Sequence, residues 1–217
     1  MPKRLLITLL LLTTTVQACR AYSLPFRAAV TSPGDVLFQD DFSDPLSGWD
    51  RLSNSASGVL DYAEGMYRIT VNTPYTLLWA TPNLIFGDVR VEVNTLKAAG
   101  PANDNFGVVC RAADKDNFYF FVISSDGYYG IGKTQDGVPQ LIGMKLMPPS
   151  EEILQGKAIN HLRADCVGES FSLYVNDVFL ARAQDSDFPS GKVGLTAGTF
   201  AEGGTEVYFD NFKVLEP

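Results

Sequence analysis

The side chains in this sequence that could bind a metal, form a disulfide or transfer a proton near neutral pH include three cysteines, at positions 19, 110 and 166, and a single histidine, His161. A zinc site takes four closely grouped Cys and His ligands, and no second group of such residues accompanies His161 in the sequence. We therefore expect His161 to be a surface residue of a strand. Three thiols cannot all pair within one chain, so at least one cysteine needs another role.

The odd cysteine directly follows an export signal. Residues 1–18 combine a basic start, an apolar run and a small-residue exit, which is typical of a secretory signal peptide. The apolar run is too short for a membrane span, which needs about 20 residues. Cys19 resembles the lipobox cysteine of bacterial lipoproteins, whose thiol is diacylated, and two acyl chains anchor a protein stably. Gln17 departs from the lipobox pattern, so ordinary cleavage after Ala18 is the alternative.

The other two cysteines face the interior of the expected fold. In residues 106–110 and 162–166, period-two alternation places Cys110 and Cys166 on the apolar faces of two separate strands. Export puts these thiols in an oxidising compartment. A bond between them would close a loop of about 57 residues and stabilise the fold by about 4 kcal/mol. We expect this disulfide, and the alternative is a pair of reduced buried thiols.

Composition and charge limit the class of protein. The chain has 217 residues, 46% of them hydrophobic, which suits one globular domain. Seventeen basic and twenty-five acidic residues give a net charge of −8, which repels the phosphates of nucleic acids. We therefore expect no nucleic-acid partner. Residues 19–34 are the expected lipidated cysteine and tether, and residues 35–217 the expected domain.

Short alternating runs separated by turn residues dominate from residue 35 onward. Residues 88–94 carry valines on one face and polar side chains on the other. Residues 117–125 are apolar on both faces, as in a strand that is covered on both sides. Hairpin turns are predicted at Asp126-Gly127, Asp136-Gly137 and Asn176-Asp177. With at most one short helix, over residues 148–157, the sequence predicts an all-β antiparallel jelly roll of two sheets.

Four segments carry a family resemblance: residues 37–49, 62–71, 106–131 and 173–214. They resemble the concanavalin A-like, or laminin G-like, jelly rolls of exported bacterial proteins, among them lectin-like and 3-keto-disaccharide hydrolase-like relatives. The resemblance implies the fold over nearly the whole mature chain. It does not imply one function, because this fold hosts lectin modules, glycan hydrolases and adhesion domains.

The resemblance transfers no catalytic residue. Laminarinase-type relatives carry a Glu-x-Asp-x-x-Glu strand, and a retaining glycosidase needs two carboxyl groups about 5 Å apart. That motif is missing here, and the apolar run 117–125 contains no acid. We expect Glu92 to pair with a cation such as Arg90 or Arg111. A hydrolase of the 3-keto-glycoside or glucanase-like type stays open as an alternative.

The resemblance also implies a structural calcium where the first and last strands meet. The matching residues are Asp41, the Gly65 carbonyl and Asp210, and calcium takes six to eight such oxygens with waters. A change of alternation phase near Asp210 and Asn211 predicts a β-bulge there. The alternative is a solvated acidic turn.

Aromatic side chains are the candidate carbohydrate-binding residues, because rings stack on the apolar faces of sugars. The candidates are Tyr75, Trp79, Tyr119, Tyr128 and Tyr129.

Together these features favour a non-catalytic, lectin-like module that binds a glycan outside the cytoplasm and is held at the cell envelope by a lipid on Cys19. The alternatives are the glycan hydrolase and a structural or adhesion domain that binds another protein.

Overall fold

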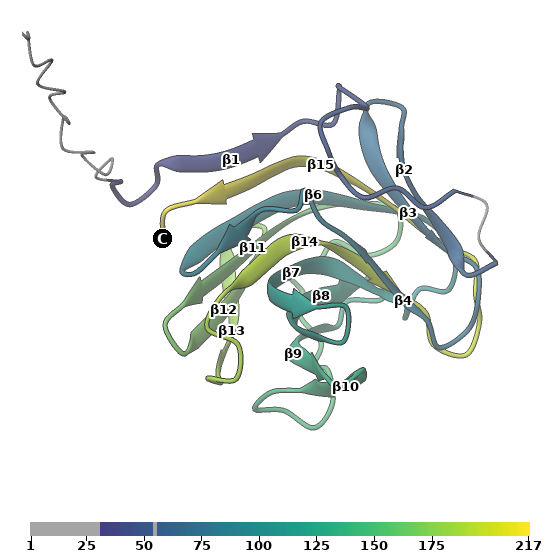
Figure 1. Ribbon diagram of the computed structural model, residues 1–217. Coiled ribbons are helices and arrows are strands. Elements are labelled where there is room, and N and C mark those ends of the chain that lie inside the picture. The colour runs from purple at the N-terminus through teal and green to yellow at the C-terminus, as the bar shows by residue number, and fades with distance from the viewer. Residues whose placement is uncertain (1–30, 54–55) are drawn as a thin grey trace, which may run out of the picture. The chain divides into compact units, whose positions relative to one another are not determined.

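The computed structural model describes residues 31–53 and 56–217. The predictions for the signal peptide and for Cys19 therefore lie outside the described residues. The described part is all-β, with two antiparallel sheets (Figure 1). The described residues contain no candidate membrane-spanning helix. The predicted two-sheet jelly roll is confirmed.

The larger sheet has eight strands in the order β13-β12-β11-β6-β15-β3-β2, with β1 paired to β15. Its strands are β1 (Val36–Asp40), β2 (Gly58–Ala63), β3 (Met66–Val71), β6 (Val89–Ala99), β11 (Ile159–Val167), β12 (Ser170–Val175), β13 (Val178–Gln184) and β15 (Thr205–Leu215). Strand β15 lies between β3 and β6, so the end of the chain forms the middle of this sheet.

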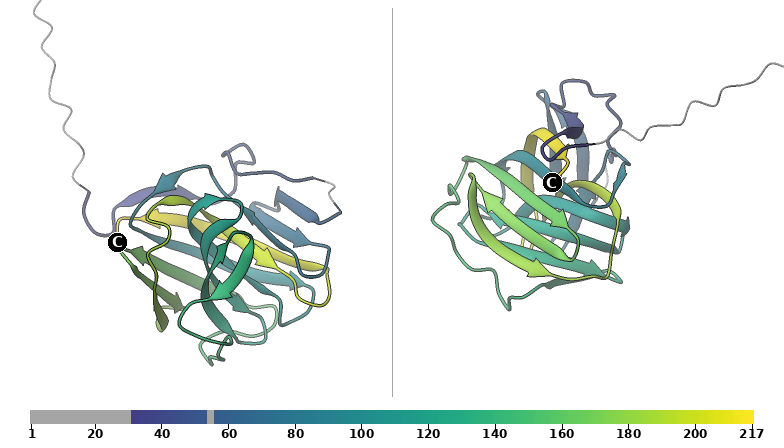
Figure 2. Two further views of the ribbon diagram at one scale, coloured as in Figure 1. Left: turned by 60° about the horizontal axis from the view of Figure 1, so that its bottom comes forward. Right: turned by 90° about the vertical axis from the view of Figure 1, so that its left-hand side faces the viewer.

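The second sheet has seven strands in the order β10-β9-β8-β7-β14-β4, with β5 paired to β14. Its strands are β4 (Leu77–Ala80), β5 (Ile85–Phe86), β7 (Asn105–Asp114), β8 (Asn117–Ser124), β9 (Tyr129–Gln135), β10 (Val138–Leu141) and β14 (Gly191–Gly198). The two sheets stack face to face (Figure 2).

The main core lies between the sheets and follows the alternation of the strands. Along β8, Tyr119, Phe121 and Ile123 point into this core. Phe118 and Phe120 point the other way and join a second apolar cluster on the outer face of the seven-stranded sheet. Burying a side chain of this size contributes about 1.5–3 kcal/mol. The prediction that this strand is covered on both faces is confirmed.

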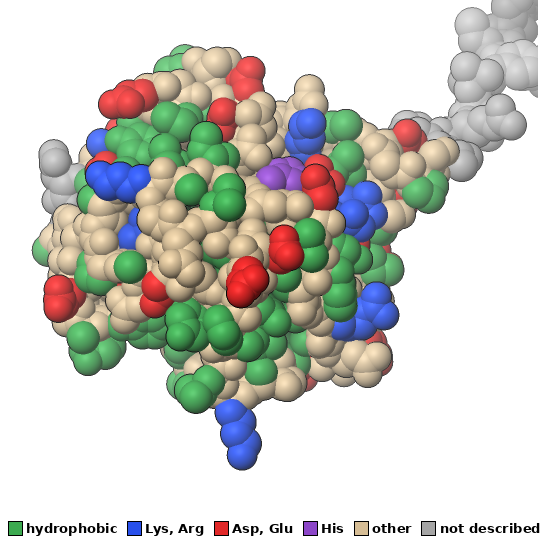
Figure 3. Space-filling model, turned by 180° about the vertical axis from the view of Figure 1, so that it is seen from behind, with side chains coloured by type: hydrophobic (Ala, Val, Ile, Leu, Met, Phe, Trp, Pro, Cys, Tyr) green, Lys and Arg blue, Asp and Glu red, His purple; other side chains and the backbone are tan. Residues whose placement is uncertain are grey.

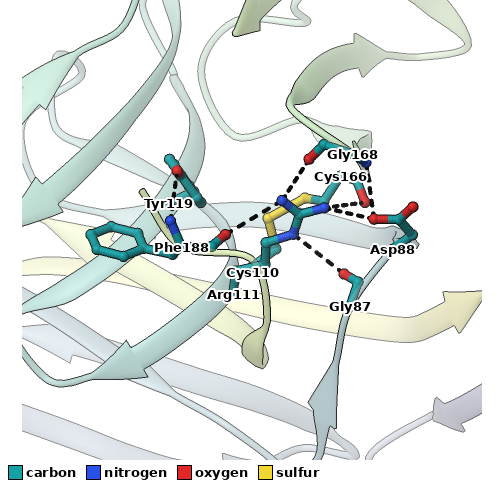
Figure 4. Close-up of polar contacts among 8 residues, drawn as sticks. All are labelled: Gly87, Asp88, Cys110, Arg111, Tyr119, Cys166, Gly168 and Phe188. Atoms are coloured by element: carbon teal, nitrogen blue, oxygen red, sulfur yellow. Dashed lines mark hydrogen bonds and ion pairs between the residues drawn. A yellow bond between two sulfur atoms is a disulfide. The ribbon is translucent and has the colours of Figure 1, made fainter. Parts of the chain in front are cut away.

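A disulfide between Cys110 on β7 and Cys166 on β11 links the two sheets, as predicted (Figure 4). The buried Arg111 lies next to it. Its guanidinium donates to the carbonyl of Gly168 at 2.7 Å and to the Asp88 carboxylate at 2.8 Å. A buried charge is tolerated only when it is paired in this way. Arg111 therefore holds loops from both sheets around the disulfide.

The predicted turns are present where the sequence places them. The hairpin between β12 and β13 turns at Asn176 and Asp177, whose φ angles of 51° and 68° are both left-handed. The turns at Asp126-Gly127 and Asp136-Gly137 flank β9. A register shift between Asp210 and Lys213 confirms the bulge in β15.

The short helix does not form. Two backbone N–H groups of residues 148–157 donate to carbonyls outside the segment: Ser150 to Gly127 at 2.8 Å and Gly156 to Ser125 at 2.8 Å. The Leu154 N–H donates to the Asn160 side chain at 2.9 Å. In a helix that begins at Ser150, the N–H groups of Leu154 and Gly156 would donate within the helix. Packing against the turn before β9 therefore replaces the helix.

Candidate functional site

An apolar pocket of about 700 Å³ opens on the outer face of the seven-stranded sheet. Ligand sites typically have volumes of about 300–1,000 Å³. Its apolar wall comprises Leu77, Phe120, Val122, Leu141, Leu146 and Met147. Hydrophobic side chains also gather in the lower half of the molecule in Figure 3, the end at which Figure 1 places β9 and β10.

The floor of the pocket depends on glycines in β9. Ile131 points into the main core, so Gly130 and Gly132 face outward. A Cβ atom at Gly132 would lie 2.3 Å from the Phe120 ring, and one at Gly130 would lie 2.9 Å from the Leu141 side chain. Because Gly130 and Gly132 have no side chains, Phe120 and Leu141 can lie directly over β9 and form the floor of the pocket.

Three aromatic side chains stand at the edge of this pocket: Tyr75, Tyr128 and Phe200. Their exposed fractions are 79%, 41% and 40%. Tyr75 also has a left-handed backbone with a φ of 51°. A non-glycine residue in this region costs about 1–3 kcal/mol, and such residues cluster at functional sites. We call these three side chains the aromatic rim.

Hydrogen bonds that end on a buried carboxylate hold two residues of the rim, Tyr75 and Phe200. The Tyr75 N–H donates to the Phe200 carbonyl at 2.7 Å, and the Phe200 N–H donates to the Asp104 carboxylate at 3.0 Å. Asp104 is fully buried and shares the hydroxyl of Thr205 with the buried Lys97. Burial lowers the pKa of Lys97, and Asp104 opposes this shift. The two rim loops are therefore fixed to the interior of the fold.

The polar groups around the pocket are few. The Thr199 hydroxyl donates to the Thr73 carbonyl at 2.6 Å, and the Thr76 hydroxyl is bonded to that of Thr73 at 2.8 Å. The side-chain oxygen of Asn105 is buried and has no hydrogen-bond partner within residues 31–53 and 56–217. Lys145 supplies a charge, and the described lining contains no carboxylate.

The structure separates the five predicted rings by direction. Tyr75 and Tyr128 line the pocket. Trp79 lies on the same outer face and packs on Phe118, with 5.6 Å between ring centroids. Tyr129 packs against the main core and donates to the Leu180 carbonyl at 3.2 Å. Its hydroxyl thus points away from the pocket.

The prediction that Tyr119 binds carbohydrate is wrong, because its ring is buried between the sheets. Its hydroxyl donates to Asp185 at 2.6 Å and accepts the N–H of Phe188 at 3.1 Å. Burial, together with Asp185, raises the pKa of Tyr119 to about 12. Lys133 donates to the same Asp185 carboxylate at 2.6 Å. Tyr119 therefore holds the loop after β13 instead of a ligand.

Arg90 on β6 and Arg111 on β7 each form a structural ion pair. Arg90 pairs with Asp165 at 2.9 Å and Arg111 pairs with Asp88 at 2.8 Å, so the partners expected for Glu92 were wrong. The single histidine, purple in Figure 3, lies at the surface as predicted. Its Nδ1 is 3.1 Å from the side-chain oxygen of Asn94.

The calcium site stays a prediction. Asp41 lines a hollow of about 340 Å³ with Asn211, whereas Gly65 and Asp210 do not line it. The Ser43 hydroxyl and N–H both donate to Asp41 and lower the pKa of that carboxyl. Within the described ranges, no three Asp, Glu, His or Cys side chains gather closely enough to hold a metal ion.

Much of the pocket wall consists of residues that were not predicted from the sequence. Phe200 lies between small and polar residues in a glycine-rich turn, and its ring is exposed. A lone aromatic residue in such a turn could have been predicted from the sequence as a binding residue. Leu146 and Met147 lie in a segment without periodicity, which gives no sign of the strand that they approach.

Solved structures with the same fold include carbohydrate-active proteins. No protein-family model and no curated protein matches the sequence. The carbohydrate-binding module CBM66 from Bacillus subtilis is 17% identical, with a TM-score of 0.54 over 78% of this chain and 96% of that one. A Bacillus licheniformis beta-glucanase is 12% identical, with a TM-score of 0.59 over 85% and 99%.

A third similar structure is a Bacillus subtilis protein of unknown function with a galectin-like fold. It is 10% identical, with a TM-score of 0.60 over 86% of this chain and 98% of that one. At these identities the similarity shows a shared jelly-roll fold. Function must be argued from the site.

Proposed function

We propose that this protein binds a glycan, without catalysis, at the aromatic rim on the outer face of the seven-stranded sheet. The observation that carries the proposal is the arrangement of Tyr75, Tyr128 and Phe200 as exposed rings around one pocket. Exposed rings provide stacking surfaces for sugars. The carbohydrate-binding module of the same fold supports a carbohydrate ligand.

The absence of carboxylates from the described pocket lining favours binding over hydrolysis. Hydrolysis by the usual route needs an acid and a second carboxyl group within reach of the sugar. The beta-glucanase of the same fold keeps a hydrolase as the alternative. Release of reducing sugar from the retained glycan would favour that alternative.

A glycan array probed with the purified domain tests the proposal. We expect retention of at least one glycan by the wild type and at least about tenfold weaker binding by Tyr128→Ala, because one stacking ring is lost. Phe179→Ala is the matched control, since Phe179 is 48% exposed and lies on β13 of the other sheet. Retention of no glycan, or equal loss in both variants, would overturn the proposal.

The proposal includes a location outside the cytoplasm with a lipid on Cys19. It is supported by the sequence of residues 1–19, which lie outside the described residues. Mass spectrometry of the mature protein should find a diacylated Cys19 at the amino terminus. An unmodified terminus would contradict the anchor.

A further inference from the structure

The pocket beneath the aromatic rim is more apolar than a sugar requires. Its floor and far wall consist of Leu77, Phe120, Val122, Leu141 and Met147. A hydroxyl group buried against such a wall without a hydrogen-bond partner loses about 1–3 kcal/mol. Full entry of an unsubstituted sugar ring into the pocket is therefore unfavourable.

The polar groups near the pocket do not change this conclusion. The hydroxyls of Thr76 and Thr199 are already bonded to the chain, at 2.8 Å and 2.6 Å. The side-chain oxygen of Asn105 lacks a hydrogen-bond partner among the described residues, but it is buried and presents almost no surface to a ligand. The Gln140 amide donates to the Gln135 side chain at 3.4 Å, and Lys145 is exposed to solvent.

We infer that the ligand is a glycan with an apolar substituent, such as an acyl chain or an aryl group, and that the pocket holds this substituent. The inference rests on the proposed glycan function. The sugar lies at the rim against Tyr75 and Tyr128, and the substituent fills the space above Phe120 and Met147. The pocket volume of about 700 Å³ admits a group of this size.

Titration calorimetry with a matched pair of ligands tests the inference. Octyl β-glucoside, used below its micelle concentration, carries the apolar chain, and methyl β-glucoside does not. Because each buried methylene adds about fourfold in affinity, we expect the octyl compound to bind at least about tenfold more tightly. The chain-length dependence is readable even where glucose is not the preferred sugar.

Two leucines with similar exposure provide the variants. Leu146 lines the pocket and is 81% exposed, whereas Leu46 lies outside the pocket lining and is 83% exposed. Neither substitution opens the core. Leu146→Ser should weaken octyl glucoside about fivefold, since part of the apolar wall is removed, and Leu46→Ser should leave it unchanged.

The outcomes separate the two proposals. Equal affinity for the octyl and methyl compounds, with glycans still retained on the array, would overturn the inference and leave the glycan function intact. Equal affinity for octyl glucoside and an octyl tetraethylene glycol ether, with no glycan retained, would overturn the glycan function and with it the glycan substituent. Equal weakening by Leu146→Ser and Leu46→Ser would place the octyl chain elsewhere and overturn the inference.

Discussion

At the scale of single residues, the Asp185 carboxylate joins two elements. Lys133 on β9 and Tyr119 on β8 both donate to it at 2.6 Å. Burial alone would raise the pKa of Asp185, but the hydrogen bonds from Lys133 and Tyr119 outweigh burial and lower it. The loop after β13 is therefore held by an ionised side chain that has few exposed atoms.

This lowered pKa makes part of the stability pH-dependent. The folded protein keeps Asp185 ionised below the ordinary pKa of 3.8, so its contribution is complete above that value and is lost as the pH falls through the lower folded pKa. Asp185→Asn should reduce the free energy of unfolding at neutral pH by about 1–3 kcal/mol and flatten its decline in acid. Urea unfolding over a pH series measures both effects.

The exposed turn residue Asp177 provides the control for this measurement. Its left-handed backbone, with a φ of 68°, suits asparagine, so Asp177→Asn changes the charge without strain. Its unfolding curve should follow the wild type. Identical pH profiles for Asp185→Asn and Asp177→Asn would contradict the stabilising role of Asp185.

Residue type alone predicts only part of the candidate site. Tyr128 and Tyr129 are neighbours of the same type, yet one lines the pocket and the other faces the main core. The other sheet determines which face of β8 and β9 points inward. The local sequence of these strands carries no information about that sheet. The direction of Tyr119 was missed for that reason. Tyr75 and Tyr128 were predicted together with three rings that do not line the pocket, so the sequence did not distinguish them.

At the scale of elements, the disulfide links strands β7 and β11 of opposite sheets. Its cysteines are 56 residues apart, so the bond restricts a long loop in the unfolded chain. The double variant Cys110→Ala, Cys166→Ala should lower the free energy of unfolding by about 2–5 kcal/mol. Denaturant unfolding measures the loss, by comparing the variant with the wild type and the wild type with and without reductant. An unchanged unfolding midpoint in both comparisons would contradict the prediction.

Strands were predictable where the alternation is local. The alternating valines of β6 and the apolar residues on both faces of β8 predict correctly which side chains are buried. The Asn176-Asp177 pair predicts the hairpin between β12 and β13. Residues 148–157 were not predictable in this way. Their helix-like composition is overridden by hydrogen bonds to the turn at Ser125 and Gly127, which no local pattern encodes.

At the scale of the whole molecule, the outer faces of the two sheets differ in the side chains that they carry. The seven-stranded sheet carries a second apolar cluster and the aromatic rim on its outer face. The eight-stranded sheet carries ion pairs there, with Arg90 and Arg163 both bonded to Asp165. We therefore expect the ligand to bind on the outer face of the seven-stranded sheet.

The most direct test of this assignment is the mapping of amide NMR shifts during titration with a glycan retained by the array. The largest shifts should fall on Tyr75, Tyr128 and Phe200, around the pocket of the seven-stranded sheet. Shifts that cluster instead on the outer face of the eight-stranded sheet, around Tyr174 and Phe179, would contradict it.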